Sequence, residues 1–333
     1  TTIVLAGPTA NNKRNLSGGW TIAWQGGEEE RYPEDMHTIY TALQEEFPNA
    51  TIELVTEMPA ADDESAIQAM MNQLDAADMI VYAGGEEPYT EFVGNIKDLT
   101  LAEDQRNDLE LLGRSDTPLT LVLVQGRPRI ITPVYSSLEA IVHAGLPGFE
   151  GAEAIAGLIS GSINPSGKLP FSYPQHTGHY LNYNHKSSDV YFFNPQEANH
   201  IAQGSPNTSL FQFGDGLSYT SFAYSDLALD RDEVAADGTI TASVTVTNTG
   251  DRAGMESVLW FTRDMVGSIT RPVKELKHFE KIQLEPGESR TVTFAFSPEE
   301  KLWFPNERGE QLLEPGLFTL MVGDLTAEFT LTN

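Results

Sequence analysis

The feature that most constrains the fold is a pattern of short apolar runs that end in glycine. Residues Met79–Ala83 are uninterruptedly apolar and precede Gly84 and Gly85, and the apolar run Leu119–Val124 is followed closely by Gly126. Continuous apolar runs of this length are typical of strands that are buried on both faces of a parallel sheet. Glycine at a strand end permits positive φ and close approach of loops. The pattern predicts that several loops crowd together at the edge of the sheet where the strands end. Open α/β sheets bind their ligands at such an edge.

Segments with the helical spacing of apolar residues separate these strands. Strands alternating with helices predict right-handed βαβ units, and therefore a mainly parallel sheet sandwiched by helices. We assign residues 1–175 to this α/β domain. Thr100 and Glu103 form a capping-box pattern for a helix that continues through Leu112. The remaining expected elements are helices at 34–47, 65–76 and 150–160 and strands at 3–6, 51–56 and 140–144.

The second half of the chain has a different periodicity. Thr239–Asn248 alternates between apolar residues and threonine or serine, and turns such as Glu285-Pro286-Gly287 separate further alternating segments. About seven short strands of this kind predict an antiparallel β-sandwich of the fibronectin type III or immunoglobulin class over residues 222–333. Residues 176–221 are rich in Pro, Gly, Asn, Tyr and His, and we expect them to form a wrapping linker.

The composition excludes several classes of function. The net charge of −28, from 48 acidic and 20 basic residues, disfavours nucleic acid and anionic membranes as partners. The chain contains no run of ~18 apolar residues, the length that a membrane-spanning helix needs. Cysteine is absent, which removes disulfides, thiol nucleophiles and cysteine zinc sites. Glycine-rich nucleotide-binding motifs are also missing, which disfavours a nucleotide-dependent enzyme. His179, His185 and His200 lack metal-ligand spacing, so we expect neither a metal nor a cofactor.

Three carboxylates follow the strand Met79–Ala83, namely Glu86, Glu87 and Glu91. Paired carboxyl groups are the chemistry of glycosidases, in which one protonates the leaving oxygen and the other attacks the anomeric carbon. Position alone does not separate Glu91 from the other acidic residues of the chain. Glu86 and Glu87 are alternatives, expected to shape the loop or to make supporting hydrogen bonds. Arg127 and Glu150, on other strand-end loops, are predicted to form a buried ion pair.

Eight segments of the chain carry recognisable motifs, namely Gly18–Gly26, Gly85–Glu91, Val124–Pro128, Leu146–Gly151, Asn164–Pro170, Tyr183–Lys186, Phe211–Tyr219 and Arg271–Leu276. Taken in order, these motifs resemble glycoside hydrolase family 3, the β-glucosidases and exo-β-glucanases. Family members of this type contain a TIM-like barrel, an α/β sandwich domain and a fibronectin III-like domain, and this chain is similar to the second and third. The barrel, which carries the aspartate nucleophile, has no counterpart here, so it would be lost or would be a separate polypeptide.

The resemblance implies roles for individual residues. Glu91 matches the general acid/base, and Trp24 matches an indole that contacts the sugar on its leaving-group side, with packing in the core as its alternative. Glu87 and Tyr89 become candidates for substrate binding, and Trp20 is expected to be a packing residue.

The resemblance also implies the reaction and the partners. It implies part of a retaining exo-acting β-glucosidase or β-glucan exohydrolase that acts on β-glucosides or β-glucan oligosaccharides. Such an enzyme would be secreted or periplasmic, and this chain would be inactive without the barrel. A non-catalytic carbohydrate-binding or scaffold module is the alternative.

Overall fold

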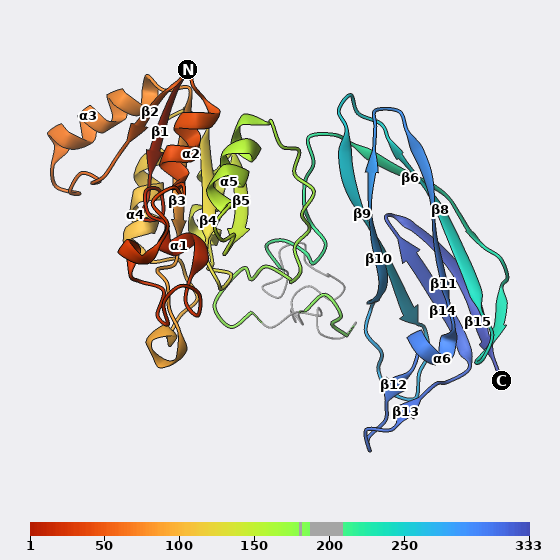
Figure 1. The fold of residues 1–333 in the computed structure, drawn as a ribbon. Coiled ribbons are helices and arrows are strands. Elements are labelled where there is room, and N and C mark those ends of the chain that lie inside the picture. The colour runs from red at the N-terminus through yellow and green to blue at the C-terminus, as the bar shows by residue number, and fades with distance from the viewer. Residues whose placement is uncertain (180–181, 187–208) are drawn as a thin grey trace, which may run out of the picture. The chain divides into compact units, whose positions relative to one another are not determined.

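The computed structural model describes residues 1–179, 182–186 and 209–333, which form two compact units (Figure 1). The first unit contains residues 1–163 and 174–178, and the second contains residues 164–173 and the chain from 179 onward. His200 lies outside the described residues.

The first unit is built on a five-stranded sheet in which every neighbouring pair is parallel. Its strand order is β2-β1-β3-β4-β5, which confirms the predicted parallel sheet. The apolar runs found in the sequence are the central strand β3 and its neighbour β4, and β4 is buried throughout. The strand bounds are β1 (Thr2–Ala6), β2 (Thr51–Leu54), β3 (Met79–Gly85), β4 (Leu119–Val124) and β5 (Ala140–Gly145).

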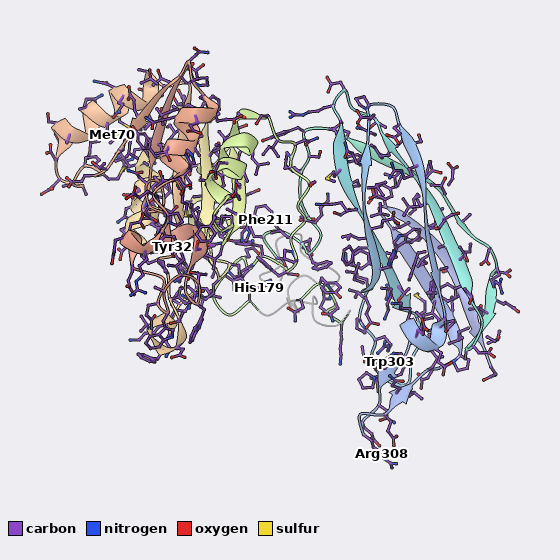
Figure 2. All side chains as sticks on the ribbon, in the orientation of Figure 1. Tyr32, Met70, His179, Phe211, Trp303 and Arg308 are labelled. Atoms are coloured by element: carbon purple, nitrogen blue, oxygen red, sulfur yellow. The ribbon has the colours of Figure 1, made fainter. Side chains whose placement is uncertain are left out.

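Helices cover both faces of this sheet. The face that presents Val81 and Ala83 packs against α2 and α5 in one apolar core, which also contains Tyr32 (Figure 2). Tyr82 points to the opposite face, because successive strand residues alternate, and donates a hydrogen bond to Asp108 of α4 at 2.8 Å. The helix bounds are α1 (Arg14–Ser17), α2 (Ile39–Glu46), α3 (Glu64–Asp75), α4 (Glu103–Leu112) and α5 (Gly151–Ser160), with 3-10 turns η1 (Glu29–Arg31), η2 (Glu91–Gly94) and η3 (Thr132–Ser137).

Two helix starts differ from the prediction. The helix expected from residue 34 begins at Ile39, because the Thr38 side chain accepts a hydrogen bond from the Thr41 N–H and forms a capping box there. The capping box predicted from Thr100 and Glu103 is wrong. Helix α4 has Ala102 at its N-cap and no side-chain cap. The Thr100 N–H instead binds Asp98 Oδ1 at 2.5 Å.

The second unit is an antiparallel β-sandwich that fits the predicted fibronectin III-like class. One sheet has the order β10-β9-β14-β15-β7, the other has the order β11-β8-β6, and Trp260 is fully buried in the core between them. Seven strands are long enough to show the alternation seen in the sequence, whereas β7, β12 and β13 are too short to do so. The bounds are β6 (Phe222–Leu229), β7 (Glu233–Ala235), β8 (Ile240–Asn248), β9 (Gly254–Asp264), β10 (Glu275–Leu284), β11 (Ser289–Phe296), α6 (Pro298–Lys301), β12 (Phe304–Pro305), β13 (Gln311–Leu312), β14 (Gly316–Val322) and β15 (Leu325–Thr332).

Among the residues that the structure describes, no helix has the length and apolar character needed to cross a bilayer.

Candidate active site

The candidate site lies at the carboxyl edge of the first sheet. Because its strands are parallel, the loops that follow β1, β3, β4 and β5 all leave from the same edge. The loop after β3 carries Glu86, Glu87, Tyr89 and Glu91. Two consecutive strands therefore deliver the predicted acidic loop and the loop 125–129 to neighbouring positions.

The β3 strand end is fixed by a glycine and an amide. Gly85 has φ +135°, and a Cβ at this position would lie 1.9 Å from the Val124 carbonyl oxygen, so only glycine allows β3 and β4 to approach so closely here. The Gln105 side chain of α4 then accepts from the Gly85 N–H at 2.9 Å and donates to the Gly85 carbonyl at 2.9 Å. This buried amide orients the peptide from which the acidic loop departs.

Glu86 is a buried carboxylate that joins the two loops. Its side chain is 3% exposed and forms ion pairs with Arg127 and Arg129, each with a nitrogen 2.8 Å from Oε1. Oε2 accepts from the backbone N–H groups of Gly126 at 3.1 Å and Arg127 at 2.9 Å. Charge-assisted bonds of this kind are stronger than neutral ones. The predicted ion pair of Arg127 with Glu150 is therefore wrong, since Glu86 takes that place.

The two arginines extend this clamp to the far end of the acidic loop. Arg127 Nη1 donates to the Gly94 carbonyl, and Arg129 Nη1 donates to the Asp98 carbonyl at 3.1 Å. The Arg127 guanidinium also lies 3.8 Å from the centroid of the Tyr89 ring. Burial, and next the Glu86 carboxylate, raise the pKa of the Tyr89 phenol. The loop between Glu86 and Asp98 is thus held at both ends and at its middle.

Glu91 begins the η2 turn on this clamped loop. It is exposed, and its backbone φ of +47° lies in the left-handed region that residues other than glycine seldom occupy. Within the described part of the chain its carboxylate has neither an ion pair nor a hydrogen bond. Strained backbone of this kind persists only where the surrounding structure imposes it, and it is concentrated at functional sites. The arrangement presents a free carboxylate, able to give or take a proton, on a rigid support.

The loop that carries Trp20 and Trp24 packs directly against the acidic loop. A Cβ on Gly19 would lie 2.4 Å from the Tyr89 carbonyl oxygen, so glycine is needed for this approach. Gln25 Oε1 accepts from the Thr90 N–H at 3.3 Å. Trp24 is 50% exposed and Trp20 is 67% exposed. The core alternative for Trp24 is therefore wrong. Trp20 packs against Trp24, with their ring centroids 6.1 Å apart, and not in the core.

The predicted site residues are thus brought to one rim, although their roles in binding and catalysis stay predictions. Glu87 is exposed and pairs with Arg14 at 2.9 Å, whereas Tyr89 is half-buried beneath Arg127. Sequence reasoning missed Arg129 and Gln105. The signal that could have revealed the clamp is a pair of strand-end motifs. After one strand, a glycine is followed within three residues by two arginines, and the neighbouring strand ends in a glycine followed directly by a glutamate.

The histidines of the linker and the acidic residues of the chain are the side chains with metal-ligand chemistry. In the ranges that the structure describes, no cluster of three or more His, Asp or Glu side chains could hold a metal ion. His185 Nδ1 contacts the Lys186 carbonyl at 2.9 Å and His179 Nε2 contacts Ser209 Oγ at 3.3 Å.

Comparison with known proteins identifies the two units. Residues 1–219 match the glycosyl hydrolase family 3 C-terminal domain, and residues 256–326 match a fibronectin type III-like domain. The chain belongs to glycosyl hydrolase family 3.

Individual relatives align with nearly the whole chain. A lysosomal beta glucosidase of Dictyostelium discoideum is 34% identical over 97% of this chain and 40% of its own length. A periplasmic beta-glucosidase of Salmonella typhimurium is 33% identical over 97% of this chain and 44% of its own length. The crystal structure of a β-glucosidase from Listeria innocua in complex with glucose superposes with a TM-score of 0.85 at 30% identity, covering 100% of this chain and 46% of that one. The chain thus spans less than half the length of these relatives.

Proposed function

We propose that this chain supplies the general acid/base of a retaining, exo-acting β-glucosidase or β-glucan exohydrolase. Glu91 protonates the glycosidic oxygen as the bond to the anomeric carbon breaks. It then takes a proton from the water that releases the glycosyl-enzyme intermediate. The nucleophile is an aspartate on the barrel domain that the family resemblance implies, and the substrates are β-glucosides or β-glucan oligosaccharides. No cofactor takes part in this chemistry.

The observation that carries the proposal is the state of Glu91, an unpaired carboxylate on a loop clamped by Glu86, Arg127 and Arg129 at the ligand-binding edge of a family 3 domain. A solvated acid on a flexible loop would neither hold a proton-transfer geometry nor need such a support. The relatives named as β-glucosidases, and the Listeria innocua enzyme solved with glucose and with laminaribiose, support the choice of substrate class.

An exposed apolar surface surrounds this carboxylate. Trp20, Trp24, Phe92, Val93 and Ile96 are each between 39% and 68% exposed, on the two loops that pack together at the rim. Contiguous apolar surface of this kind marks an interface or a ligand site. We propose that the barrel domain covers this surface, because this chain accounts for less than half the length of the relatives. Covering the rim would also remove water, which favours the protonated form of a carboxylic acid.

The direct test compares the 333-residue chain with the polypeptide that joins it to the barrel. We expect the longer polypeptide to release glucose from laminaribiose and the chain alone to release none, since one carboxyl group of the pair is missing from it. Hydrolysis by the purified chain alone would contradict the proposal. So would an inactive longer polypeptide that binds laminaribiose, and that result would favour the non-catalytic carbohydrate-binding module.

Trp24 provides a second prediction. Replacing it by alanine in the barrel-containing polypeptide removes a flat apolar face against which the sugar on the leaving-group side could stack. We expect KM for laminaribiose to rise by about tenfold, which corresponds to ~1.4 kcal/mol. Glucose inhibition should change little, because glucose occupies the other subsite. Phe279→Ala is the matched control, because Phe279 is an exposed aromatic residue of the β-sandwich unit. An unchanged KM in the Trp24→Ala enzyme would remove this residue from the binding site.

We further propose a secreted or periplasmic location, in keeping with the relatives named as periplasmic and lysosomal.

A further inference from the structure

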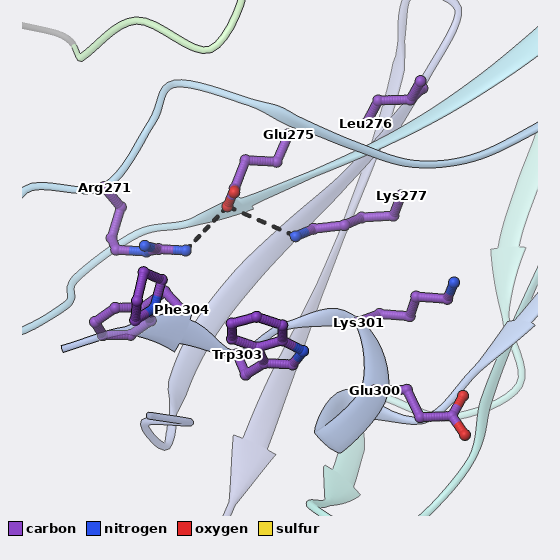
Figure 3. A pocket seen from close by; sticks show the side chains of 9 residues that line it. Arg271, Glu275, Leu276, Lys277, Glu300, Lys301, Trp303 and Phe304 are labelled. Carbon is purple, nitrogen blue, oxygen red and sulfur yellow. Dashed lines mark hydrogen bonds and ion pairs between the residues drawn. The ribbon is translucent and has the colours of Figure 1, made fainter. Parts of the chain in front are cut away.

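The β-sandwich unit contains a pocket that the proposed reaction does not use. It has a volume of ≈ 400 Å³, within the range of small-molecule sites. It opens between the start of β10 and the segment that joins α6 to β12. Trp303 lines it from that segment and Phe304 from the start of β12 (Figure 3). Figure 2 shows Trp303 beside β12 in this unit. All of its lining residues belong to the second unit.

An exposed indole lies in this pocket. Trp303 is 37% exposed, whereas Trp260 of the same unit is fully buried in the core. Core packing therefore does not account for Trp303. The neighbouring Phe304 is buried, with the Arg271 guanidinium 4.0 Å from its ring centroid. An aromatic face left open beside polar groups is the usual platform for the C–H face of a sugar ring.

Cationic groups face this platform. Arg271 is neutralised by two carboxylates, Glu275 at 3.0 Å and Asp264 at 3.4 Å. Lys277 has a side chain that is only 12% exposed, and it forms a longer ion pair with Glu275, at 3.7 Å. Figure 3 shows its ammonium group inside the pocket. Burial lowers the pKa of Lys277, and the Glu275 carboxylate opposes that shift.

The charge of the lining departs from that of the whole protein. Lys301 is exposed, and the described residues offer it no ion pair, while Glu300 is the lining carboxylate that does not bind Arg271. The pocket is lined by Arg271, Lys277 and Lys301 against Glu275 and Glu300, whereas the chain as a whole has 48 acidic and 20 basic residues. An exposed lysine without an ion pair among the described residues, beside an open indole, suits a ligand that combines a sugar ring with a negative charge.

We propose that this pocket binds an oligosaccharide that carries a carboxylate, with a sugar ring stacked on Trp303 and the carboxylate bound by Lys277 and Lys301. The pocket would hold the chain to acidic polysaccharide, independently of the Glu91 site. Glu300 and Glu275 would accept hydrogen bonds from sugar hydroxyl groups. This inference does not rest on the proposed β-glucosidase function.

The test uses the 333-residue chain and a matched pair of disaccharides. Cellobiouronic acid carries a carboxylate where cellobiose carries a hydroxymethyl group. Titration calorimetry measures the affinity of the chain for each. We expect cellobiouronic acid to bind at least about tenfold more tightly than cellobiose, and increasing salt to weaken its binding. Equal affinities would overturn the role of the carboxylate, and no saturable binding of either sugar would overturn the site.

Variants then locate the binding. Trp303→Ala and Lys301→Gln should each weaken cellobiouronic acid binding by about tenfold or more, the effect of one charge-assisted bond or one stacking contact. Lys301 is exposed on the short helix α6, so its replacement leaves folding intact. Lys281→Gln is the matched control, because Lys281 lies on the same strand as Lys277 but binds Ser166 Oγ at 3.0 Å. Unchanged affinity in both pocket variants, or lost affinity in Trp24→Ala, would place the ligand elsewhere.

Discussion

Glu91→Gln in the barrel-containing polypeptide should lower kcat/KM for laminaribiose by about 100- to 10,000-fold, the range that general acid–base catalysis supplies. The amide has nearly the same shape as the carboxyl group but cannot donate a proton to the leaving oxygen. A glucoside with a good leaving group, such as 2,4-dinitrophenyl β-glucoside, needs no such proton. Its glycosylation step should therefore be slowed far less, and the ratio of the two losses is the signature of a proton donor. Steady-state kinetics with both substrates measure it.

Glu110→Gln is the control for this experiment, because Glu110 is an exposed acid on α4 with no contact to the rim. Equal losses for the two substrates would contradict a proton-donating role and would indicate a residue that only binds sugar. Unchanged hydrolysis of laminaribiose would remove Glu91 from the mechanism altogether.

Glu86→Leu should destabilise the α/β unit of the 333-residue chain by about 3–5 kcal/mol, because it leaves two arginines without their shared carboxylate. Glu86 also accepts two backbone hydrogen bonds, which leucine cannot replace. The two units can unfold separately, so a single transition midpoint is not a sufficient measure. Hydrogen exchange of the amides in β3 and β4 reports on the α/β unit directly, and their protection should fall by this free energy.

The matched control is Glu87→Leu, which breaks the neighbouring Glu87–Arg14 pair. That pair is exposed, with side chains 58% and 35% accessible, so its loss should cost less than about 1 kcal/mol. If the two variants lose equal protection, the clamp does not stabilise the unit in the way that its burial indicates.

The sequence predicted those features that are local and periodic. The apolar runs Met79–Ala83 and Leu119–Val124 became the central parallel strand β3 and its neighbour β4, because residues buried on both faces leave a continuous apolar signature. The alternation in Thr239–Asn248 became β8 for the complementary reason, since one face of that strand is buried.

The features that the sequence did not predict depend on pairings between distant side chains. Glu86 meets Arg127 and Arg129, which lie about forty residues away, only because β3 and β4 are neighbours in the sheet. Neither the amino-acid composition nor the spacing of apolar residues can distinguish this pairing from the one expected between Arg127 and Glu150. Similarly, Trp20 is exposed and has a backbone φ of +56°, and neither property gives a signal in the residue pattern.

The left-handed backbone at Glu91 separates stability from activity at this position. Glycine adopts such a torsion angle freely, whereas a glutamate held there costs on the order of 1 kcal/mol. Glu91→Gly would therefore relax the turn while deleting the carboxylate. Directed evolution for thermal tolerance alone would favour that replacement, and retaining the acid requires a simultaneous screen for turnover.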